Sequence, residues 1–176
     1  DDMVITISHL GYIKRTPLAD FRQQGRGGVG AKASAARDED FIEYVHQANM
    51  HSTMMFFTEQ GRLYWTKVYE LPEGNRQSKG RALQNMINIQ KGDKVCAFIH
   101  VKNLSDMEYV QNHYLIFATK NGLMKKTTLE AYSRPRANGI IALGLREDDR
   151  LIRVTLTDGN SQMLVASYNG KVVRFP

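Results

Sequence analysis

A glycine-led segment recurs four times along the chain, and this repeat restricts the possible folds more than any other feature. The segments read Gly-Tyr-Ile-Lys-Arg, Gly-Arg-Leu-Tyr-Trp, Gly-Leu-Met-Lys-Lys and Gly-Lys-Val-Val-Arg, and they begin at Gly11, Gly61, Gly122 and Gly170. The glycines lie 50, 61 and 48 residues apart. A period near 50 residues indicates an array of similar structural units stacked side by side.

Each of these glycines follows a short apolar run and a turn. The runs are rich in β-branched and aromatic residues and cover Met3–Ile7, Thr53–Phe57, Tyr114–Ala118 and Met163–Ala166. Turn residues such as Asn121-Gly122 separate each run from the glycine-led segment. Asn-Gly favours a tight hairpin because both positions adopt positive φ readily. Each unit is therefore predicted to hold a hairpin made of a buried strand and a more basic strand.

Further strands are predicted after acidic turns, at Val95–Val101 and Leu151–Leu156. No segment keeps a 3.6-residue period over three turns, and the best helical candidate is Ala31–Tyr44. The prediction is an all-β, propeller-like array of four-stranded blades that is truncated. Its repeats are placed near residues 3–52, 53–112 and 113–161, with a partial repeat at 162–176.

Composition restricts the class of protein. The 176 residues include 24 basic and 18 acidic side chains, a net charge of +6 that favours a polyanionic partner. The single cysteine, Cys96, excludes an internal disulfide framework and fits a reducing cytosol. No apolar run is long enough to span a membrane, and no signal-peptide pattern opens the chain. Because the chain begins with Asp1 and stops within a predicted strand, we expect it to be a piece of a longer protein.

The basic residues concentrate in phase with the repeat. Residues 1–37, 62–81 and 120–136 hold 16 of the basic residues and only six of the acidic ones. In each repeat this charge falls on the second hairpin strand and on the loop after it. Stacked repeats place equivalent positions along one path, and a cationic path suits a duplex backbone, whose neutralised phosphates release counterions. The alternative is that these basic side chains only keep the exposed faces of the strands hydrated and bind no partner.

The densest local signal is the glycine-rich loop from Gln23 to Lys32. Four glycines within six residues let the backbone approach a phosphodiester closely, and Arg26 and Lys32 supply charge. A dinucleotide-binding fingerprint is disfavoured because no βαβ pattern surrounds the loop. A phosphate-binding P-loop is excluded, since Ala31 follows the last glycine where Lys-Ser/Thr is required. A plain flexible linker remains the alternative.

No constellation of residues predicts catalysis or metal binding. The five histidines lack a recurring ligand spacing, and Cys96 lies in the apolar strand Val95–Ile99, which favours a core position. Trp65, Tyr64 and Tyr12 are expected to pack in or at the edge of blades. The chain is therefore predicted to carry no catalytic residue, no metal and no cofactor of its own.

The ordered motifs resemble the C-terminal domains of the A subunits of DNA gyrase. The resemblance is carried by Gly11–Leu18, Gln24–Gly30 with Ala35–Arg37, Lys67–Pro72, Thr119–Thr127 and Gly170–Phe175, and it runs over essentially the whole chain. The family has a seven-residue gyrase A-box: Gln, basic, Arg, Gly, Gly, basic, Gly. Gln24, Arg26, Gly27, Gly28 and Gly30 match this box, whereas Gly25 and Val29 replace its two other basic residues.

The resemblance implies a β-pinwheel of four-stranded blades around which duplex DNA bends with positive handedness. Catalytic domains elsewhere in the same protein, with ATP hydrolysis on a B subunit in an A2B2 complex that uses ATP and Mg, would then introduce negative supercoils. It also implies a cytoplasmic, nucleoid-associated protein of a bacterium. Two alternatives remain: the A subunit of topoisomerase IV, whose related domain has a degraded or absent box, and a propeller that binds acidic proteins. The five matching box positions favour gyrase.

The cationic path and the loop together supply the predicted DNA-binding residues. They are Lys14, Arg15, Arg22, Gln24, Gly25, Arg26, Gly27, Gly28, Gly30, Lys32, Arg37, Arg62, Lys67, Arg76, Lys79, Arg81, Lys125, Lys126, Arg134 and Arg136.

Overall fold

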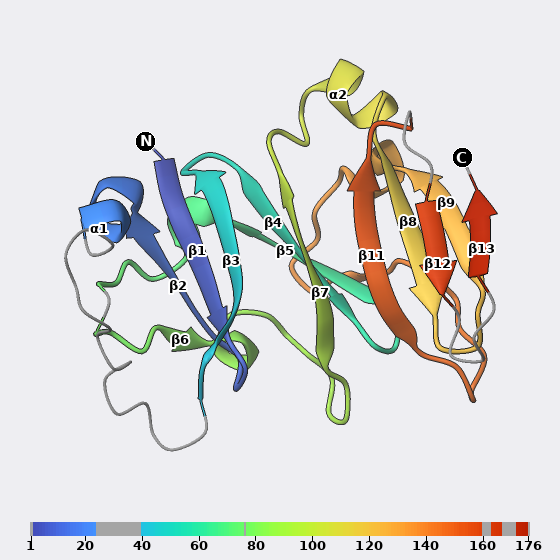
Figure 1. Ribbon diagram of the computed structural model, residues 1–176, viewed down its shortest axis with the longest axis horizontal. Coiled ribbons are helices and arrows are strands. Elements are labelled where there is room, and N and C mark those ends of the chain that lie inside the picture. Colours follow the sequence, from blue (N-terminus) through green and yellow to red (C-terminus); the bar gives the residue numbers. More distant parts are fainter. Residues whose placement is uncertain (1, 24–39, 76, 160–162, 167–171, 176) are drawn as a thin grey trace. The chain divides into compact units, whose positions relative to one another are not determined.

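The computed structural model describes residues 2–23, 40–75, 77–159, 163–166 and 172–175, whose strands form four sheets (Figure 1). The chain divides into two compact units. The first comprises Asp1–Thr53 and Thr66–Asn88, and the second comprises Met54–Trp65 and Ile89–Pro176. The all-β, propeller-type architecture predicted from the repeat is confirmed.

The first unit contains a four-stranded sheet. Its strands are β1 (Asp2–Ser8), β2 (Tyr12–Pro17), β3 (Ile42–Asn49) and β6 (Arg81–Ala82), in the order β3-β1-β2-β6. The helix α1 (Leu18–Gln23) follows β2, and the short 3-10 helices η1 (Val68–Glu70) and η2 (Leu83–Asn85) flank β6 along the chain. Ile5, Ile7 and Ile13 are fully buried, so the β1–β2 hairpin is the centre of this unit's core.

The second unit contains most of the next four-stranded sheet, whose order is β10-β5-β4-β7. Its strands are β4 (Thr53–Thr58), β5 (Arg62–Lys67), β7 (Val95–Val101) and β10 (Ile140–Ile141). A third sheet follows in the order β11-β8-β9, with β8 (Tyr114–Thr119), β9 (Met124–Thr128) and β11 (Leu151–Thr157). The strands β12 (Met163–Ala166) and β13 (Val172–Phe175) pair as a hairpin.

Two short helices and an aromatic cluster complete the second unit. The helix α2 (Met107–Gln111) lies between β7 and β8, and η3 (Leu129–Tyr132) follows β9. The ring of Phe117 packs edge-on against Phe57 at 5.6 Å and against Tyr132 at 5.9 Å between centroids. All three rings are buried, and they belong to one apolar core that includes side chains from β4, β8 and η3.

The predicted strands lie where the apolar runs placed them, within one or two residues at each end. The helical candidate Ala31–Tyr44 is wrong where the structure describes it, because Ile42–Tyr44 begin β3 and pair with β1. Isolated helical propensity is overridden there by the backbone ladder that β1 offers. The remainder of that candidate lies outside the described residues.

Each complete sheet takes its last strand from the repeat that follows it in sequence. In the first unit β6 pairs with β2 through Tyr12–Ala82 and Ile13–Arg81. In the second unit β10 pairs with β5 through Leu63–Ile140. We call the two segments that deliver these strands, residues 74–82 and 133–141, the returning loops. A blade is therefore assembled from two consecutive repeats.

Candidate nucleic-acid interface

The hairpin turns of the first three sheets are built in the same way. The turn glycines Gly11, Gly61 and Gly122 have φ near +86°, a region that side chains avoid. The N–H of each glycine donates to the carbonyl oxygen three residues earlier, in Ser8, Thr58 and Thr119 respectively. These three repeat glycines are therefore required by the backbone of the turn.

The carboxylate of an aspartate is hydrogen-bonded to each of these hairpin turns. Asp40, Asp93 and Asp149 each accept one N–H from a hairpin turn and one from the residue that follows the aspartate. Burial alone would raise the pKa of Asp149, but hydrogen bonds from Thr119 and from backbone N–H groups lower it below its ordinary value. The pKa of Asp40 is lowered in the same way. These carboxylates belong to the scaffold that orients the basic strands.

Each returning loop crosses the second hairpin strand at a glycine. Gly80 has φ +84° and Gly139 has φ +71°. A Cβ at Gly139 would lie 2.6 Å from the carbonyl oxygen of Leu63, and one at Gly80 would clash with the carbonyl of Ile13. Glycine is required at both crossings because the backbones touch, and this contact fixes the position of the neighbouring cations.

Two of the predicted DNA-binding residues, Lys14 and Arg15, make hydrogen bonds to other residues of the first unit. Lys14 is buried, and its Nζ donates to the carbonyl oxygens of Asn75 at 2.7 Å and Ser78 at 2.8 Å. Burial lowers the pKa of the Lys14 ammonium. Lys14 therefore ties the first returning loop to β2, and its charged group faces backbone rather than solvent.

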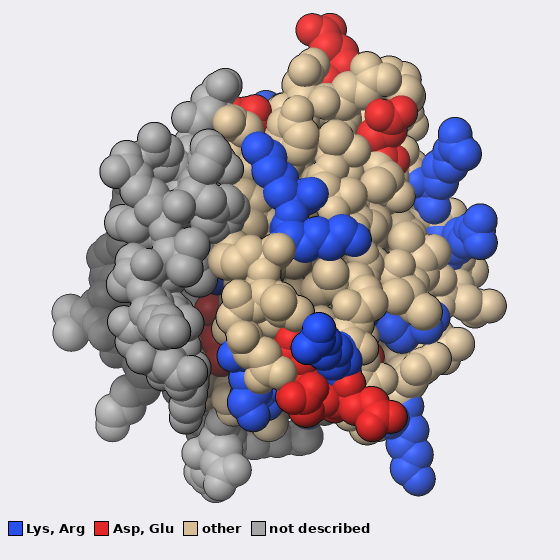
Figure 2. All heavy atoms as spheres, turned by 90° about the vertical axis from the view of Figure 1, so that its right-hand side faces the viewer, with Lys and Arg blue, Asp and Glu red and all other residues tan. Residues whose placement is uncertain are grey.

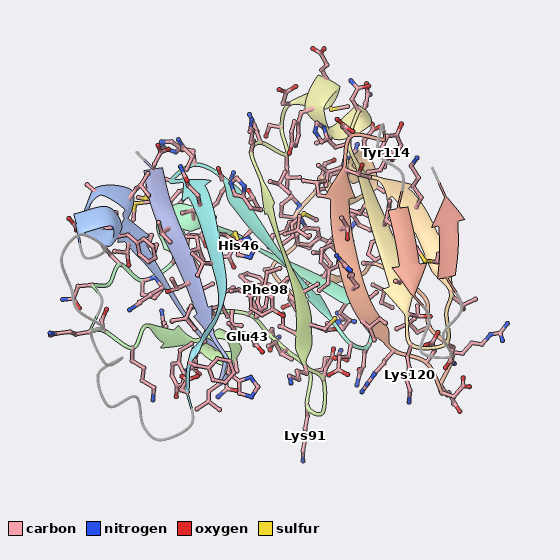
Figure 3. All side chains as sticks on the ribbon, viewed as in Figure 1. Glu43, His46, Lys91, Phe98, Tyr114 and Lys120 are labelled. Atoms are coloured by element: carbon pink, nitrogen blue, oxygen red, sulfur yellow. The ribbon has the colours of Figure 1, made fainter. Side chains whose placement is uncertain are left out.

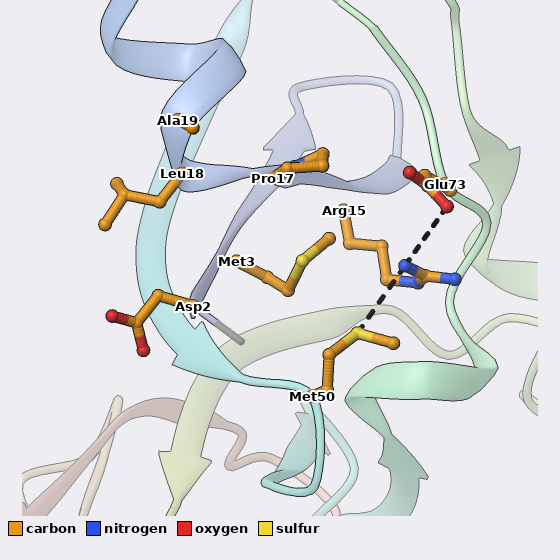
Figure 4. A pocket seen from close by; sticks show the side chains of 8 residues that line it. All are labelled: Asp2, Met3, Arg15, Pro17, Leu18, Ala19, Met50 and Glu73. Atoms are coloured by element: carbon orange, nitrogen blue, oxygen red, sulfur yellow. Dashed lines mark hydrogen bonds and ion pairs between the residues drawn. The ribbon is translucent and has the colours of Figure 1, made fainter.

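Arg15 is engaged in a similar tie beside a cavity of about 610 Å³ (Figure 4). Its Nε donates to the carbonyl of Leu71 at 2.8 Å, and its guanidinium lies 3.6 Å from Glu73. The cavity is lined by Asp2, Met3, Arg15, Pro17, Leu18, Ala19, Met50 and Glu73. In the second unit Trp65, four residues after its turn glycine as Arg15 is, donates Nε1 to the carbonyl of Tyr132 at 3.1 Å. This position thus joins one repeat to the next.

The other described cations of the predicted path lie at the surface. Lys79 and Arg81 are exposed on the first returning loop, and Arg134 and Arg136 are exposed on the second. Lys125 and Lys126 are exposed on β9, while Arg62 and Lys67 on β5 are half-buried. Figure 2 shows lysine and arginine side chains spread over one face, with acidic side chains gathered toward its upper and lower ends.

Among the described residues, three cations lie against tyrosine rings. Lys79 Nζ is 4.0 Å from the ring centroid of Tyr12, and Lys126 Nζ is 4.6 Å from that of Tyr114. The guanidinium of Arg62 is 6.0 Å from the ring of Tyr64 and also donates to its hydroxyl at 3.2 Å. Figure 3 labels Tyr114 at the start of β8 and Lys120 directly after its end. Such cation–π contacts restrict where a long basic side chain points.

Sequence reasoning missed both the inward role of Lys14 and the partner role of the tyrosines. A signal for the first was available: the position three after the turn glycine holds Lys14, Tyr64, Lys125 and Val173, and two bulky apolar members indicate a buried site. The contact between Lys79 and Tyr12 had no sequence signal, because the two residues are far apart in the chain. Arg62 and Tyr64 lie two residues apart on β5, and that spacing places them on the same face of the strand.

Several predicted residues fall where the structure gives no position. Arg22 has its backbone in α1, and its side chain is not described. The residues that lie outside the described part are Gln24, Gly25, Arg26, Gly27, Gly28, Gly30, Lys32, Arg37 and Arg76.

The histidine, cysteine and acidic side chains of the described residues bear on metal binding and reactivity. Within that part of the chain, no group of three His, Cys, Asp or Glu side chains could hold a metal ion. Burial, with the charges of Glu59 and Asp93, raises the pKa of Cys96 to about 12, which favours the neutral thiol near neutral pH. Burial also raises the pKa of Tyr132, whose hydroxyl donates to the carbonyl of Ala142 at 2.9 Å.

None of the helices in the described part of the chain has the length and apolar character that crossing a bilayer requires.

Comparison with known proteins places this arrangement among related domains. A family model described as "DNA gyrase C-terminal domain, beta-propeller" matches residues 2–49, 52–102 and 113–158. The chain is 43% identical over 175 residues to the A subunits of DNA gyrase from Haemophilus influenzae and Aeromonas salmonicida. These alignments cover 99% of this chain but only 19% and 18% of the two relatives, so the chain spans about a fifth of their length.

Solved structures show the same fold. The C-terminal domain of DNA topoisomerase IV is 26% identical with a TM-score of 0.78, and 99% of this chain covers 51% of that one. A DNA gyrase A C-terminal domain is 18% identical with a TM-score of 0.58, and the match covers 99% of this chain and 71% of the other. At that identity the second likeness concerns the fold alone.

Proposed function

The chain belongs to the DNA gyrase C-terminal domain family, and on that premise we propose that it binds the outside of duplex DNA and bends it around a rim of exposed cations. The rim consists of the exposed cations on the returning loops, Lys79 and Arg81 in the first unit and Arg134 and Arg136 in the second. The glycine-rich loop with Arg26 and Lys32 is proposed to extend it.

The observation that carries this proposal is the equivalence of the returning loops. Both loops follow a 3-10 helix, η1 or η3, and both cross a hairpin strand at a glycine that leaves no room for a side chain. Both also present two exposed cations close to that crossing. A duplex backbone offers phosphates at regular spacing, so cations at repeated positions match it without any requirement for a particular base sequence.

Bending explains why many weak contacts are needed. Bending 20–30 bp costs on the order of 1–6 kcal/mol, and a single phosphate contact does not offset that cost. Contacts repeated on successive blades add up along the curved path. We therefore expect affinity with little sequence preference and with a steep dependence on salt.

The proposed role within the whole protein follows from the relatives, which are A subunits of DNA gyrase. In this proposal the chain wraps DNA without catalysing a reaction, and strand passage and ATP hydrolysis with Mg occur on other domains and on a B subunit. The protein works on bacterial DNA in the cytoplasm. The 43% identity to these relatives favours gyrase over topoisomerase IV.

A salt titration of duplex binding tests the proposal. The logarithm of the binding constant should fall linearly with the logarithm of salt concentration, with a slope of about −0.9 for each phosphate contact. Absence of binding to duplex at low salt would overturn the proposal. Ligation of nicked minicircles then separates bending around the rim from simple adhesion, since only wrapping shifts the topoisomer distribution, here toward positive writhe.

The alternative of a propeller that binds acidic proteins is separated by the same ligation experiment. In addition, Arg26→Ala combined with Lys32→Ala should impair wrapping more than it lowers the melting temperature. If the double substitution lowered the melting temperature as much as it impaired wrapping, the loop would have a structural role instead.

A further inference from the structure

One cation lies against a tyrosine at each place where a returning loop crosses a hairpin strand. In the first unit this cation is Lys79, the residue before the crossing glycine Gly80, and it covers the ring of Tyr12. In the second unit it is Arg62, which contacts Tyr64 and also donates to the carbonyl of Asn138 at 3.2 Å.

The two crossings are structurally equivalent, although the cation comes from the returning loop in the first unit and from a strand in the second. Tyr12 and Arg62 each follow a hairpin-turn glycine directly, and each pairs with the second residue of the returned strand, Ala82 or Ile141. Lys79 and Asn138 each precede a crossing glycine. The cation is itself the residue before the crossing glycine in the first unit, and in the second unit it is a strand residue that donates to the residue before that glycine.

The supporting tyrosines are themselves fixed. The backbone of Tyr12 is held by its pairing with β6 and by an N–H bond of 3.1 Å to the Ser8 hydroxyl. Tyr64 is 1% exposed. The side chain of Lys79 remains exposed above its ring, so its ammonium is both restricted and open to solvent.

We propose that Tyr12 and Tyr64 are positioning residues that hold Lys79 and Arg62 ready to contact a DNA phosphate where each returning loop crosses its hairpin strand. This rests on the proposed DNA-binding function. A free lysine or arginine loses much of its rotamer freedom when it binds a phosphate, and a side chain already restricted by a ring loses less. The ring attracts the cation through its negative face without neutralising its charge.

Double-mutant cycles at Tyr12 and Lys79 test this role. Duplex binding is measured by fluorescence anisotropy across a salt series for the whole chain and for Tyr12→Leu, Tyr12→Phe, Lys79→Gln and Tyr12→Leu with Lys79→Gln. Tyr12→Leu should weaken binding about two- to five-fold and keep the salt slope, since the lysine charge remains. Tyr12→Phe should bind as the parent does, because it keeps the ring.

The charge variant and the double variant complete the cycle. Lys79→Gln should weaken binding and reduce the salt slope by about 0.9, and adding Tyr12→Leu should weaken it no further. Tyr69, half exposed in the same unit, is the matched control, and Tyr69→Leu should leave binding unchanged. Additive effects of Tyr12→Leu and Lys79→Gln, or a Tyr12→Phe protein as weak as Tyr12→Leu, would overturn the positioning role.

If Tyr12→Leu lowers the stability of the chain, variants at the second crossing test the positioning role independently. Tyr64→Phe removes the hydroxyl that accepts Arg62 Nε and keeps the ring, so it should weaken binding by less than Arg62→Gln does and add nothing in an Arg62→Gln background. If the unsubstituted chain failed to bind duplex at low salt, the proposed function itself would be overturned. That result is distinguishable from a failure of the positioning role alone, in which the unsubstituted chain still binds.

Discussion

The Asp149 carboxylate accepts a hydrogen bond of 3.0 Å from the backbone N–H of Asn121, the residue before the turn glycine Gly122. The second bond to the same oxygen, 2.9 Å from the N–H of Arg150, ties the start of β11 to the β8–β9 turn. Asp93 and Asp40 make the corresponding pairs of bonds in the other two sheets. A single acidic side chain therefore sets the spacing between a hairpin turn and the edge strand beside it.

Replacing Asp149 with alanine should lower the free energy of unfolding by about 1–2 kcal/mol, because two backbone N–H groups lose a charged acceptor. Chemical denaturation followed by circular dichroism measures the change. Glu147→Ala, an exposed acid two residues away, is the matched control and should alter stability by less than about 0.5 kcal/mol. Equal effects of the two substitutions would contradict the role given to Asp149.

The same carboxylates predict how stability depends on pH. The pKa of Asp40 and of Asp149 lies below the ordinary value of 3.8 in the folded chain, so unfolding raises it. The unfolded chain therefore binds protons more readily, and stability is full above about pH 4 and falls as the pH drops through the folded-state values. Denaturation midpoints between about pH 6 and pH 2.5 should decline less steeply for Asp149→Asn than for the parent. A parallel decline would exclude Asp149 as a contributor.

Most strands could be predicted from the sequence because each one has a local pattern of apolar residues. Met163–Ala166 and Val95–Val101 are short apolar runs next to turn residues, and local composition is enough to find them. The two-residue strand β10 was not accessible, since two residues show no periodicity and its pairing with Leu63 joins segments far apart in the chain.

The site was only partly predictable for a related reason. Charge in phase with the repeat predicted cations on the loop after each second hairpin strand, and Arg134 and Arg136 are exposed on one such loop. The same charge pattern wrongly suggests that Lys14 faces solvent, because the carbonyls that bind it, in Asn75 and Ser78, come from the next repeat. A basic residue is assigned to the surface unless a buried partner is known, and that partner is visible only after the chain has folded.

Lys14 and an ordinary surface lysine should therefore respond differently to substitution. Lys14→Met should lower the free energy of unfolding by about 1–3 kcal/mol, because it leaves two partly buried carbonyls without their donor. Lys91→Met, at an exposed turn (Figure 3), should have little effect on stability. Thermal and chemical denaturation measure both variants. A Lys14→Met protein as stable as the parent would show that the tie to the returning loop contributes nothing.

Alanine substitutions at three glycines should lower the stability of the chain by different amounts. Gly139→Ala should destabilise the chain by more than about 2 kcal/mol, since it combines positive φ with a clash against the Leu63 carbonyl. Gly92→Ala has positive φ and open space, so it should cost only about 1–2 kcal/mol. Gly144→Ala has open space and no positive φ and should be nearly neutral. Urea denaturation of the three variants gives this order, and equal losses for Gly139→Ala and Gly92→Ala would rule out the close approach.

Position on the rim, rather than total charge, should decide which arginines affect DNA binding. Arg134→Gln with Arg136→Gln removes two exposed cations from the second returning loop and should reduce the magnitude of the salt slope by up to about 1.8, at about 0.9 for each phosphate contact. Arg153→Gln with Arg146→Gln removes the same charge from β11 and from the turn before it. That control lowers the net charge equally, and so it should weaken binding only through the long-range field while leaving the slope nearly unchanged. Identical slopes for the two double variants would mean that duplex responds to net charge alone, and the returning loops would then have no special part in binding.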